Sequence, residues 1–223
     1  MKIPEPIVLL GANGFARETA HLIAAINARE PQWDLLGFLD DNLAGERIDG
    51  YRVLGPLDAV HAYPNSWVMC AIGSVTTSAS RMAILSRLGI EPDRFATLIH
   101  PNAVIPDPSV IGVGTVIHAG TVFTISVPVG MHSRLMPQVV CTHDDVLEDN
   151  VTLASGVLLA GTVRVGRNAY VGAGACVREG VCIGPNATIG MGAVVTRDVP
   201  DSATWVGVPA RSIRARVTEA GSR

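Results

Sequence analysis

The chain has 223 residues, of which 48% are hydrophobic and 17% charged, and its formal net charge at pH 7 is -3. This length allows one or two domains with a sizeable core, and this charge gives no general attraction to nucleic acid or to an acidic membrane surface. Lys2 is the single lysine, which nearly excludes lysine-based chemistry such as a pyridoxal Schiff base. The four cysteines have neither a metal-type spacing nor a disulfide framework, so we expect a reduced, cytoplasmic protein without a metal site. We also expect no membrane span, because the one long uncharged run, over 109–133, is interrupted by Gly, Pro and His and keeps a period of six residues.

The first hundred residues alternate between short apolar strands and helical stretches. A buried strand is predicted over 7–10, followed by the turn Gly11-Ala-Asn-Gly14 and by a helix over about 16–30. Such a turn places free backbone N–H groups and the positive end of the helix dipole where a phosphate can bind. Gly11, Asn13 and Gly14 are therefore candidate binding residues; the alternative is that the glycines only permit a tight turn.

A second predicted strand, over 35–39, ends at Asp40 and Asp41, about where the acidic residue of a Rossmann-type domain meets a ribose. The alternative for this acidic pair is a solvated turn. Gly73 begins a further turn after a third strand. The remaining elements are a short helical piece after Pro56, a strand over 67–72 and a helix over about 78–88. Their alternation predicts a small parallel sheet with helices.

From Ile99 to Pro200 the sequence repeats with a period of six, in 17 blocks without an insertion. The first position of every block is apolar, and the fifth is small or β-branched except at Asp145. This period predicts a solenoid of short strands and tight turns, with three blocks to a coil of 18 residues. The second position is often a glycine, which we interpret as a turn residue: Gly112, Gly130, Gly166, Gly172, Gly184 and Gly190.

The repeat, closed by the run Trp205-Val-Gly-Val-Pro-Ala-Arg211, resembles the hexapeptide-repeat acyltransferases. This resemblance implies that the solenoid is a left-handed parallel β-helix. It also implies a homotrimer that binds acyl-CoA between neighbouring subunits.

The whole chain resembles one branch of that family, the bacillosamine-type nucleotide-sugar N-acetyltransferases and the sialic acid O-acetyltransferase-like proteins. The matching motifs are Gly11-Ala-Asn-Gly14, Phe38-Leu-Asp-Asp41, Ala71-Ile-Gly73 and Leu98-Ile-His-Pro101. The resemblance implies an α/β, Rossmann-like nucleotide-sugar-binding domain over 1–97, a β-helix acyltransferase domain over 98–212 and a tail over 213–223. It assigns substrate binding to Gly11, Asn13, Gly14, Asp40, Asp41 and Gly73.

The block from Cys141 to Val146 departs from the repeat, with a charged fifth position and a first position that is neither aliphatic nor aromatic. A departure from a strict local rule tends to mark function. His143 lies in this block, and an imidazole suits proton transfer near neutral pH. One coil further along is Gly161, which we expect to leave room for a thioester to approach the imidazole.

In the resembled branch an acidic residue directly follows the catalytic histidine, so His143 and Asp144 match it. A carboxylate on the other ring nitrogen fixes the tautomer and stabilises the imidazolium. Asp145 is the second candidate for this role. We expect direct transfer without an acyl-enzyme and an oxyanion bound by a backbone N–H near Gly161. Cys141 should point into the core and be inert.

For acetyl-CoA, the resemblance places the pantetheine arm along Gly161, Ala173 and Met191. Three other histidines, His100, His118 and His132, have no convincing zinc spacing and are interpreted as turn or surface residues. Four positions depart from the branch: Phe15 stands where His is common, Thr142 where Glu is, Thr152 where a second His is and Met136 where Asn is.

The main hypothesis is an acetyl-CoA-dependent N-acetyltransferase acting on a nucleotide-linked 4-amino-4,6-dideoxy sugar. A nucleotide-binding domain favours this reading, since it would be idle on a free sugar. The alternatives are O-acetylation of a sugar hydroxyl, as in the sialic-acid-related proteins, and a non-catalytic β-helix that binds a nucleotide sugar or scaffolds a complex.

Overall fold

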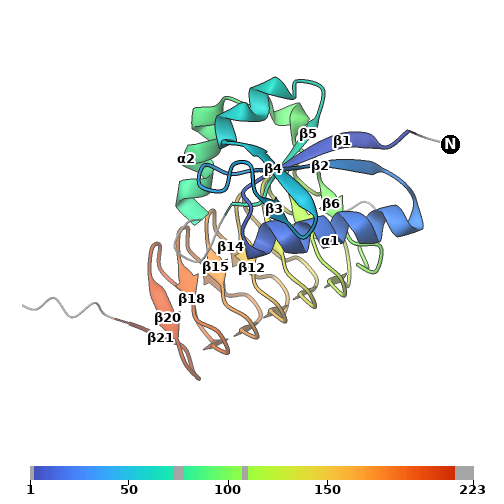
Figure 1. Cartoon of the computed structure of the whole chain (residues 1–223). Helices are drawn as coiled ribbons and strands as arrows, with labels where there is room; N and C mark the ends of the chain where they lie inside the picture. The colour runs from blue at the N-terminus through green and yellow to red at the C-terminus, as the bar shows by residue number, and fades with distance from the viewer. Residues whose placement is uncertain (1–2, 73–77, 107–109, 214–223) are drawn as a thin grey trace, which may run out of the picture.

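The computed structural model describes residues 3–72, 78–106 and 110–213. An α/β unit at the N-terminus is followed by a parallel β-helix, and the α/β unit packs on one face of the helix, over its first coils (Figure 1). Both parts agree with the sequence prediction. No helix in the described ranges is long and apolar enough to cross a membrane.

The N-terminal sheet has the strand order β3-β4-β2-β1-β5 and is parallel apart from the β3–β4 hairpin. This hairpin was not predicted, although its Asp49-Gly50 turn, with both φ angles positive, is typical of a two-residue hairpin loop. The elements are β1 (Glu5–Leu10), α1 (Gly14–Arg29), β2 (Trp33–Leu39), β3 (Arg47–Ile48), β4 (Tyr51–Gly55), the 3₁₀ helix η1 (Leu57–Ala62), β5 (Trp67–Cys70), α2 (Ser78–Leu88) and the 3₁₀ helix η2 (Pro92–Arg94).

Alternate residues of β1 point to opposite faces of this sheet, as the strand pleat requires. Ile7 and Leu9 pack with α1, whereas Val8 and Leu10 pack with residues of η1 and α2. All four side chains are fully buried. The sheet is therefore covered on both faces, which is the usual arrangement of parallel sheets.

The β-helix has three sheets of short parallel strands. One face holds β6 (Leu98–Ile99), β7 (Val116–Ile117), β9 (Arg134–Leu135), β12 (Thr152–Leu153), β15 (Tyr170–Val171), β18 (Thr188–Ile189), β20 (Thr204–Val206) and the antiparallel β21 (Arg211–Ser212). The second holds β8 (Val122–Phe123), β10 (Val140–Cys141), β13 (Leu158–Leu159), β16 (Cys176–Val177) and β19 (Val194–Val195). The third holds β11 (Val146–Leu147), β14 (Arg164–Val165) and β17 (Cys182–Ile183).

Successive coils stack with a register of 18 residues, as the repeat predicts. Leu158 pairs with Cys176 and Arg164 with Cys182, for example. The first and fifth positions of the repeat make up most of the β-helix core. A single block could not bury its apolar residue alone, so each coil is stabilised by the coils on either side.

The glycines at the second position are needed for close packing between coils, not for a turn as predicted. Their φ angles are not among the positive ones; instead, a Cβ at Gly130 would lie 2.5 Å from the backbone nitrogen of Asp149 in the next coil. Close stacking of the coils requires these glycines. Apart from Gly161, at a third position, the left-handed residues of the repeat are at the fourth position, where Asp144 has φ 61°.

Three of these left-handed residues are asparagines that form a ladder along one edge of the β-helix. The Asn150 Nδ2 donates to the Asn168 Oδ1 at 2.6 Å, and the Asn168 Nδ2 donates to the Asn186 Oδ1 at 3.0 Å. Asparagine tolerates this backbone conformation better than most residues. The ladder therefore links three coils at turns where the backbone would otherwise be strained.

We predict that Asn168→Gly lowers the free energy of unfolding by about 1 to 3 kcal/mol, because it removes both ladder bonds while glycine keeps the left-handed backbone free of strain. Gln138→Gly is the matched control: it has a similar φ, 64°, and lies outside the ladder. Urea unfolding measures both. Equal stability of the two variants would show that the ladder contributes nothing.

Candidate active site

The glycine turn after β1 has the geometry of a ligand-binding turn. Gly11 has φ 97°, and a Cβ there would lie 3.1 Å from Ile72, so only glycine fits. The Asn13 side chain accepts a hydrogen bond from the Ala16 N–H at 3.1 Å and begins α1, while Gly14 has open space around it. The turn thus presents the amino end of a 16-residue helix at the carboxyl edge of the sheet.

The two aspartates after β2 have different partners. Asp40 accepts a hydrogen bond from the Ala12 N–H at 3.1 Å and so lies beside the glycine turn. Asp41 instead accepts a hydrogen bond at 2.8 Å from the N–H of Leu57, the first residue of η1. The structure therefore brings Asp40 together with Gly11, Asn13 and Gly14, while Asp41 is engaged elsewhere. Gly73 lies outside the described residues.

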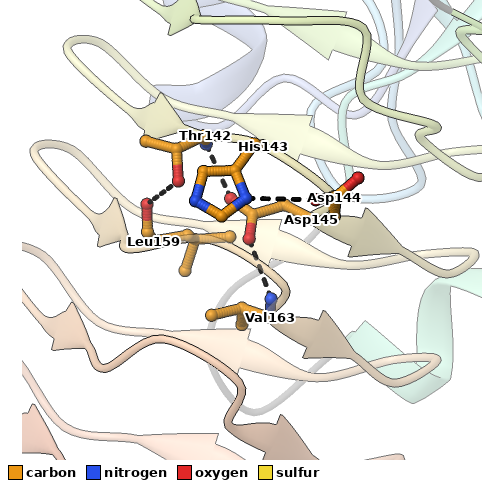
Figure 2. Close-up of polar contacts among 6 residues, drawn as sticks. All are labelled: Thr142, His143, Asp144, Asp145, Leu159 and Val163. Carbon is orange, nitrogen blue, oxygen red and sulfur yellow. Dashed lines mark hydrogen bonds and ion pairs between the residues drawn. The ribbon is translucent and has the colours of Figure 1, made fainter.

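His143 and Asp144 lie on the turn between β10 and β11, at the edge of the β-helix (Figure 2). The His143 Nδ1 is 3.1 Å from the Asp144 Oδ2, and both side chains are exposed, by 54% and 75%. With Nδ1 beside the carboxylate, Nε2 is the nitrogen left for proton transfer. The pair thus has the arrangement of a histidine base oriented by an acid.

Gly161 lies directly beside this imidazole, one coil further along. A Cβ at Gly161 would be 2.6 Å from the His143 Nε2, and the Gly161 φ is 100°. The predicted stacking is confirmed, but the glycine leaves room for the imidazole itself. The Gly161 N–H favours the ionised form of the nearby Asp145 carboxylate, against the larger effect of burial, which raises the pKa of Asp145. An oxyanion bound by a backbone N–H near Gly161 stays a prediction.

Asp145 is fully buried and does not orient the imidazole. Its carboxylate accepts hydrogen bonds from the Thr142 N–H at 2.7 Å and the Val163 N–H at 2.9 Å (Figure 2). The Thr142 hydroxyl donates to the Leu159 carbonyl at 3.1 Å. Asp145 thus joins two coils beneath the His143 turn, and the second candidate for the orienting acid is wrong for this geometric reason.

Asp145 gives a pH-dependent prediction. Burial raises the pKa of Asp145, although its backbone N–H partners oppose this. The Asp145 carboxyl of the folded protein therefore binds a proton more tightly than the same carboxyl of the unfolded chain, whose pKa is about 3.9. As pH rises from the unfolded pKa to the higher folded pKa, ionisation of Asp145 lowers the free energy of unfolding. We expect wild type to gain stability over Asp145→Asn as pH is lowered through that window. Urea unfolding at several pH values tests this, and a pH-independent difference would contradict it.

The other predicted residues take the following places. Cys141 is fully buried, and burial raises its thiol pKa, so it is an inert core residue as expected. Ala173 and Met191 are exposed on a neighbouring edge of the β-helix, where the Gly192 N–H donates to the Ala173 carbonyl at 2.8 Å. His118 and His132 were expected to be turn or surface residues; His132 does lie in a turn, but neither is a surface residue. Both are buried where the α/β unit packs on the β-helix, and burial lowers their pKa values to about 4.

Two arginines at this junction were missed by the sequence analysis. Arg134 of β9 donates to the Cys70 and Ile72 carbonyls at the end of β5, and Arg81 of α2 donates to the Asn150 carbonyl at 3.2 Å. The sequence held a weak signal for Arg134. It takes the same position of the repeat as Val116 in the preceding coil, so a charged residue replaces an apolar one on the same face.

The two halves of the candidate site are on different sides of one chain. The glycine turn belongs to the unit that packs on the face of β6, β7 and β9. His143 lies between β10 and β11, which belong to the other two faces, at the edge opposite that unit. The glycine turn and the imidazole of one chain therefore do not face each other.

Two family models match the chain. Residues 6–88 match the PglD N-terminal domain, and residues 162–197 match the bacterial transferase hexapeptide (six repeats). GDP-perosamine N-acetyltransferase of Escherichia coli O157:H7 is 34% identical over 154 residues. That alignment covers 66% of each protein, just under two thirds of the relative's length.

Among the solved structures that resemble this chain, two have bound ligands that bear on the site. The acetyltransferase domain of PglB from Neisseria gonorrhoeae FA1090, in complex with acetyl coenzyme A, has a TM-score of 0.80 and 27% identity, covering 94% of this chain and 100% of that one. PerB from Caulobacter crescentus, in complex with CoA and GDP-perosamine, has a TM-score of 0.82 and 28% identity, covering 94% and 97%. These matches confirm the predicted fold class, a Rossmann-like α/β unit followed by a left-handed parallel β-helix.

Proposed function

Because this chain belongs to the hexapeptide-repeat acyltransferases that have a PglD N-terminal domain, we propose that it transfers the acetyl group of acetyl-CoA to the amino group of a nucleotide-linked 4-amino-4,6-dideoxy sugar. The observation that carries the proposal is the His143–Asp144 pair on the β-helix edge, with its imidazole fitted against Gly161. A base of this kind suits an acceptor that must lose a proton as it attacks.

The reaction is a direct transfer. The sugar amine attacks the thioester carbonyl carbon, and the His143 Nε2 takes the proton that the nitrogen loses. Asp144 holds the Nδ1–H and stabilises the imidazolium. The tetrahedral intermediate collapses by breaking the C–S bond, and the imidazolium protonates the departing CoA sulfur. The products are the amide and free CoA, with no acyl-enzyme and no metal.

Acetyl-CoA would bind along the β-helix surface beside His143, with Gly161, Ala173 and Met191 as its contacts. Gly161 is fixed beside the imidazole, and the two other residues are exposed on the next edge. Between these edges lies the face of β10 and β13, where Leu158 is 43% exposed. An exposed apolar side chain at this place suits contact with the pantetheine arm.

The proposed assembly is a homotrimer with active sites between subunits, located in the cytoplasm with its two substrates. The support is geometric: the glycine turn and His143 lie on opposite sides of one chain. A second copy can bring its imidazole to the glycine turn of the first copy. It would also cover the exposed His143 and Leu158 and exclude water from the thioester.

The test is acetyl-CoA turnover, read as free thiol release, against UDP-, dTDP- and GDP-linked 4-amino sugars. The matched controls are the same amino sugars without the nucleotide, together with free sialic acid. The proposal predicts turnover on one nucleotide-linked amino sugar and little on its free form. Release only with a hydroxyl acceptor, or with no acceptor in the panel, would contradict it.

A further inference from the structure

Two buried positive charges meet where the α/β unit packs on the β-helix. Arg81 is 1% exposed and Arg134 is 5% exposed. Burial lowers the pKa of Arg81 to about 10 and that of Arg134 to about 9, so both guanidinium groups remain charged at neutral pH. The nearby Arg81 charge also lowers the pKa of Arg134, because like charges repel.

These charges have no carboxylate partner within the described part of the chain. None of the ion pairs there includes Arg81 or Arg134. Arg134 donates to two backbone carbonyls, and the Nε and Nη1 atoms of Arg81 are buried without an acceptor. Buried charges in proteins are normally paired, because desolvation without a counter-charge is costly. This junction is therefore an exception that calls for a function.

Arg134 lies at the carboxyl edge of the N-terminal sheet. Its acceptors, the Cys70 and Ile72 carbonyls, stand at the end of β5. Its guanidinium carbon is 4.2 Å from the ring centroid of Phe15, the second residue of α1. The His118 ring is 6.0 Å from the same phenyl ring, and its Nε2 is also buried without a partner. Ligands of parallel α/β sheets bind at this edge.

We propose that the charge of the buried Arg134, supported by Arg81, attracts the diphosphate of the acceptor to the amino end of α1, and thereby makes the enzyme selective for diphosphate-linked sugars over free ones. This rests on the proposed function and deepens it. The negative diphosphate at the amino end of α1 supplies the counter-charge that the junction lacks. In a poorly polarisable interior this attraction acts across the Phe15 ring without direct contact. Both arginines are positioning residues, remote from the acetyl transfer itself.

The test compares the affinities of GDP, UDP and dTDP with that of CoA, by calorimetry on wild type, Arg134→Met, Arg134→Lys and Arg81→Met. Arg134→Met should weaken binding of the preferred nucleoside diphosphate about tenfold or more, the size expected when one charge–charge attraction is lost in a partly desolvated site. Arg134→Lys should restore most of that affinity, and Arg81→Met should have an intermediate effect. CoA affinity should stay within about twofold throughout.

Arg164→Met, on the exposed face of β14, is the control for loss of a positive charge. It should change neither the affinity for nucleoside diphosphates nor the affinity for CoA. Thermal unfolding checks that each variant is folded, and Arg81→Met should melt no lower than wild type, because it removes a charge with two unpartnered nitrogens. If wild type binds none of the three diphosphates, the nucleotide-linked acceptor itself is wrong. If wild type binds one of them and Arg134→Met binds it equally well, or loses CoA affinity in parallel, the role of Arg134 is wrong.

Discussion

His143→Ala is expected to lower kcat for acetyl transfer by about 100-fold to 10,000-fold, the range for removing a general base. The loss should fall on kcat more than on the KM of either substrate, because the proton moves only as the amine attacks. The imidazole lies on an exposed turn, so the truncation leaves no cavity in the core. Steady-state kinetics with the preferred nucleotide sugar measures the effect.

Two further variants make this result specific. Asp144→Asn should lose less than His143→Ala, because it keeps a hydrogen-bond acceptor near the Nδ1 but not the charge that stabilises the imidazolium. His61→Ala, at an exposed histidine of η1, should behave as wild type. A His143→Ala enzyme that retains most of its kcat would exclude the imidazole as base.

Gly161→Ala should lower kcat by about 100-fold and should also lower the free energy of unfolding. The new methyl group would stand 2.6 Å from the His143 Nε2, so the imidazole must swing away. Displacing a reacting group by about 1 Å is enough for a loss of that order. The left-handed backbone, with φ 100°, adds about 1 to 2 kcal/mol of strain.

Gly180→Ala separates the two effects. Gly180 lies on the same edge one coil further along, with φ 73°, and a Cβ there would have nothing within 4 Å. It should therefore lose comparable stability, measured by urea unfolding, and keep its activity. If Gly161→Ala and Gly180→Ala have equal kcat values, the close approach of Gly161 to the imidazole has no part in catalysis.

The β-helix could be predicted almost completely because its rule is local and strictly periodic. Each sixth residue must fill the same core, so the register follows from counting. The same rule drew attention to the block of His143 and placed Gly161 beside it. It misjudged the second-position glycines because the need for them comes from the next coil, 18 residues away, rather than from their own φ angle.

The junction between the two parts could not be predicted, because it depends on contacts between distant segments. Arg134 meets carbonyls 62 and 64 positions earlier in the chain, and Arg81 reaches a carbonyl 69 positions later. No local pattern shows that a histidine such as His118, at a turn of the repeat, is covered by another domain. Likewise, spacing alone did not show that His143 and the glycine turn lie on opposite sides of one chain.

The most direct test of the account is the identity of the product formed from acetyl-CoA and the nucleotide-linked 4-amino sugar that the turnover panel selects. The account predicts one acetyl group on the intact nucleotide sugar, seen by mass spectrometry and resistant to hydroxylamine as an amide is, with none formed by His143→Ala. An acetyl group that hydroxylamine removes, or a nucleotide sugar left unmodified while CoA is released, would contradict N-acetylation.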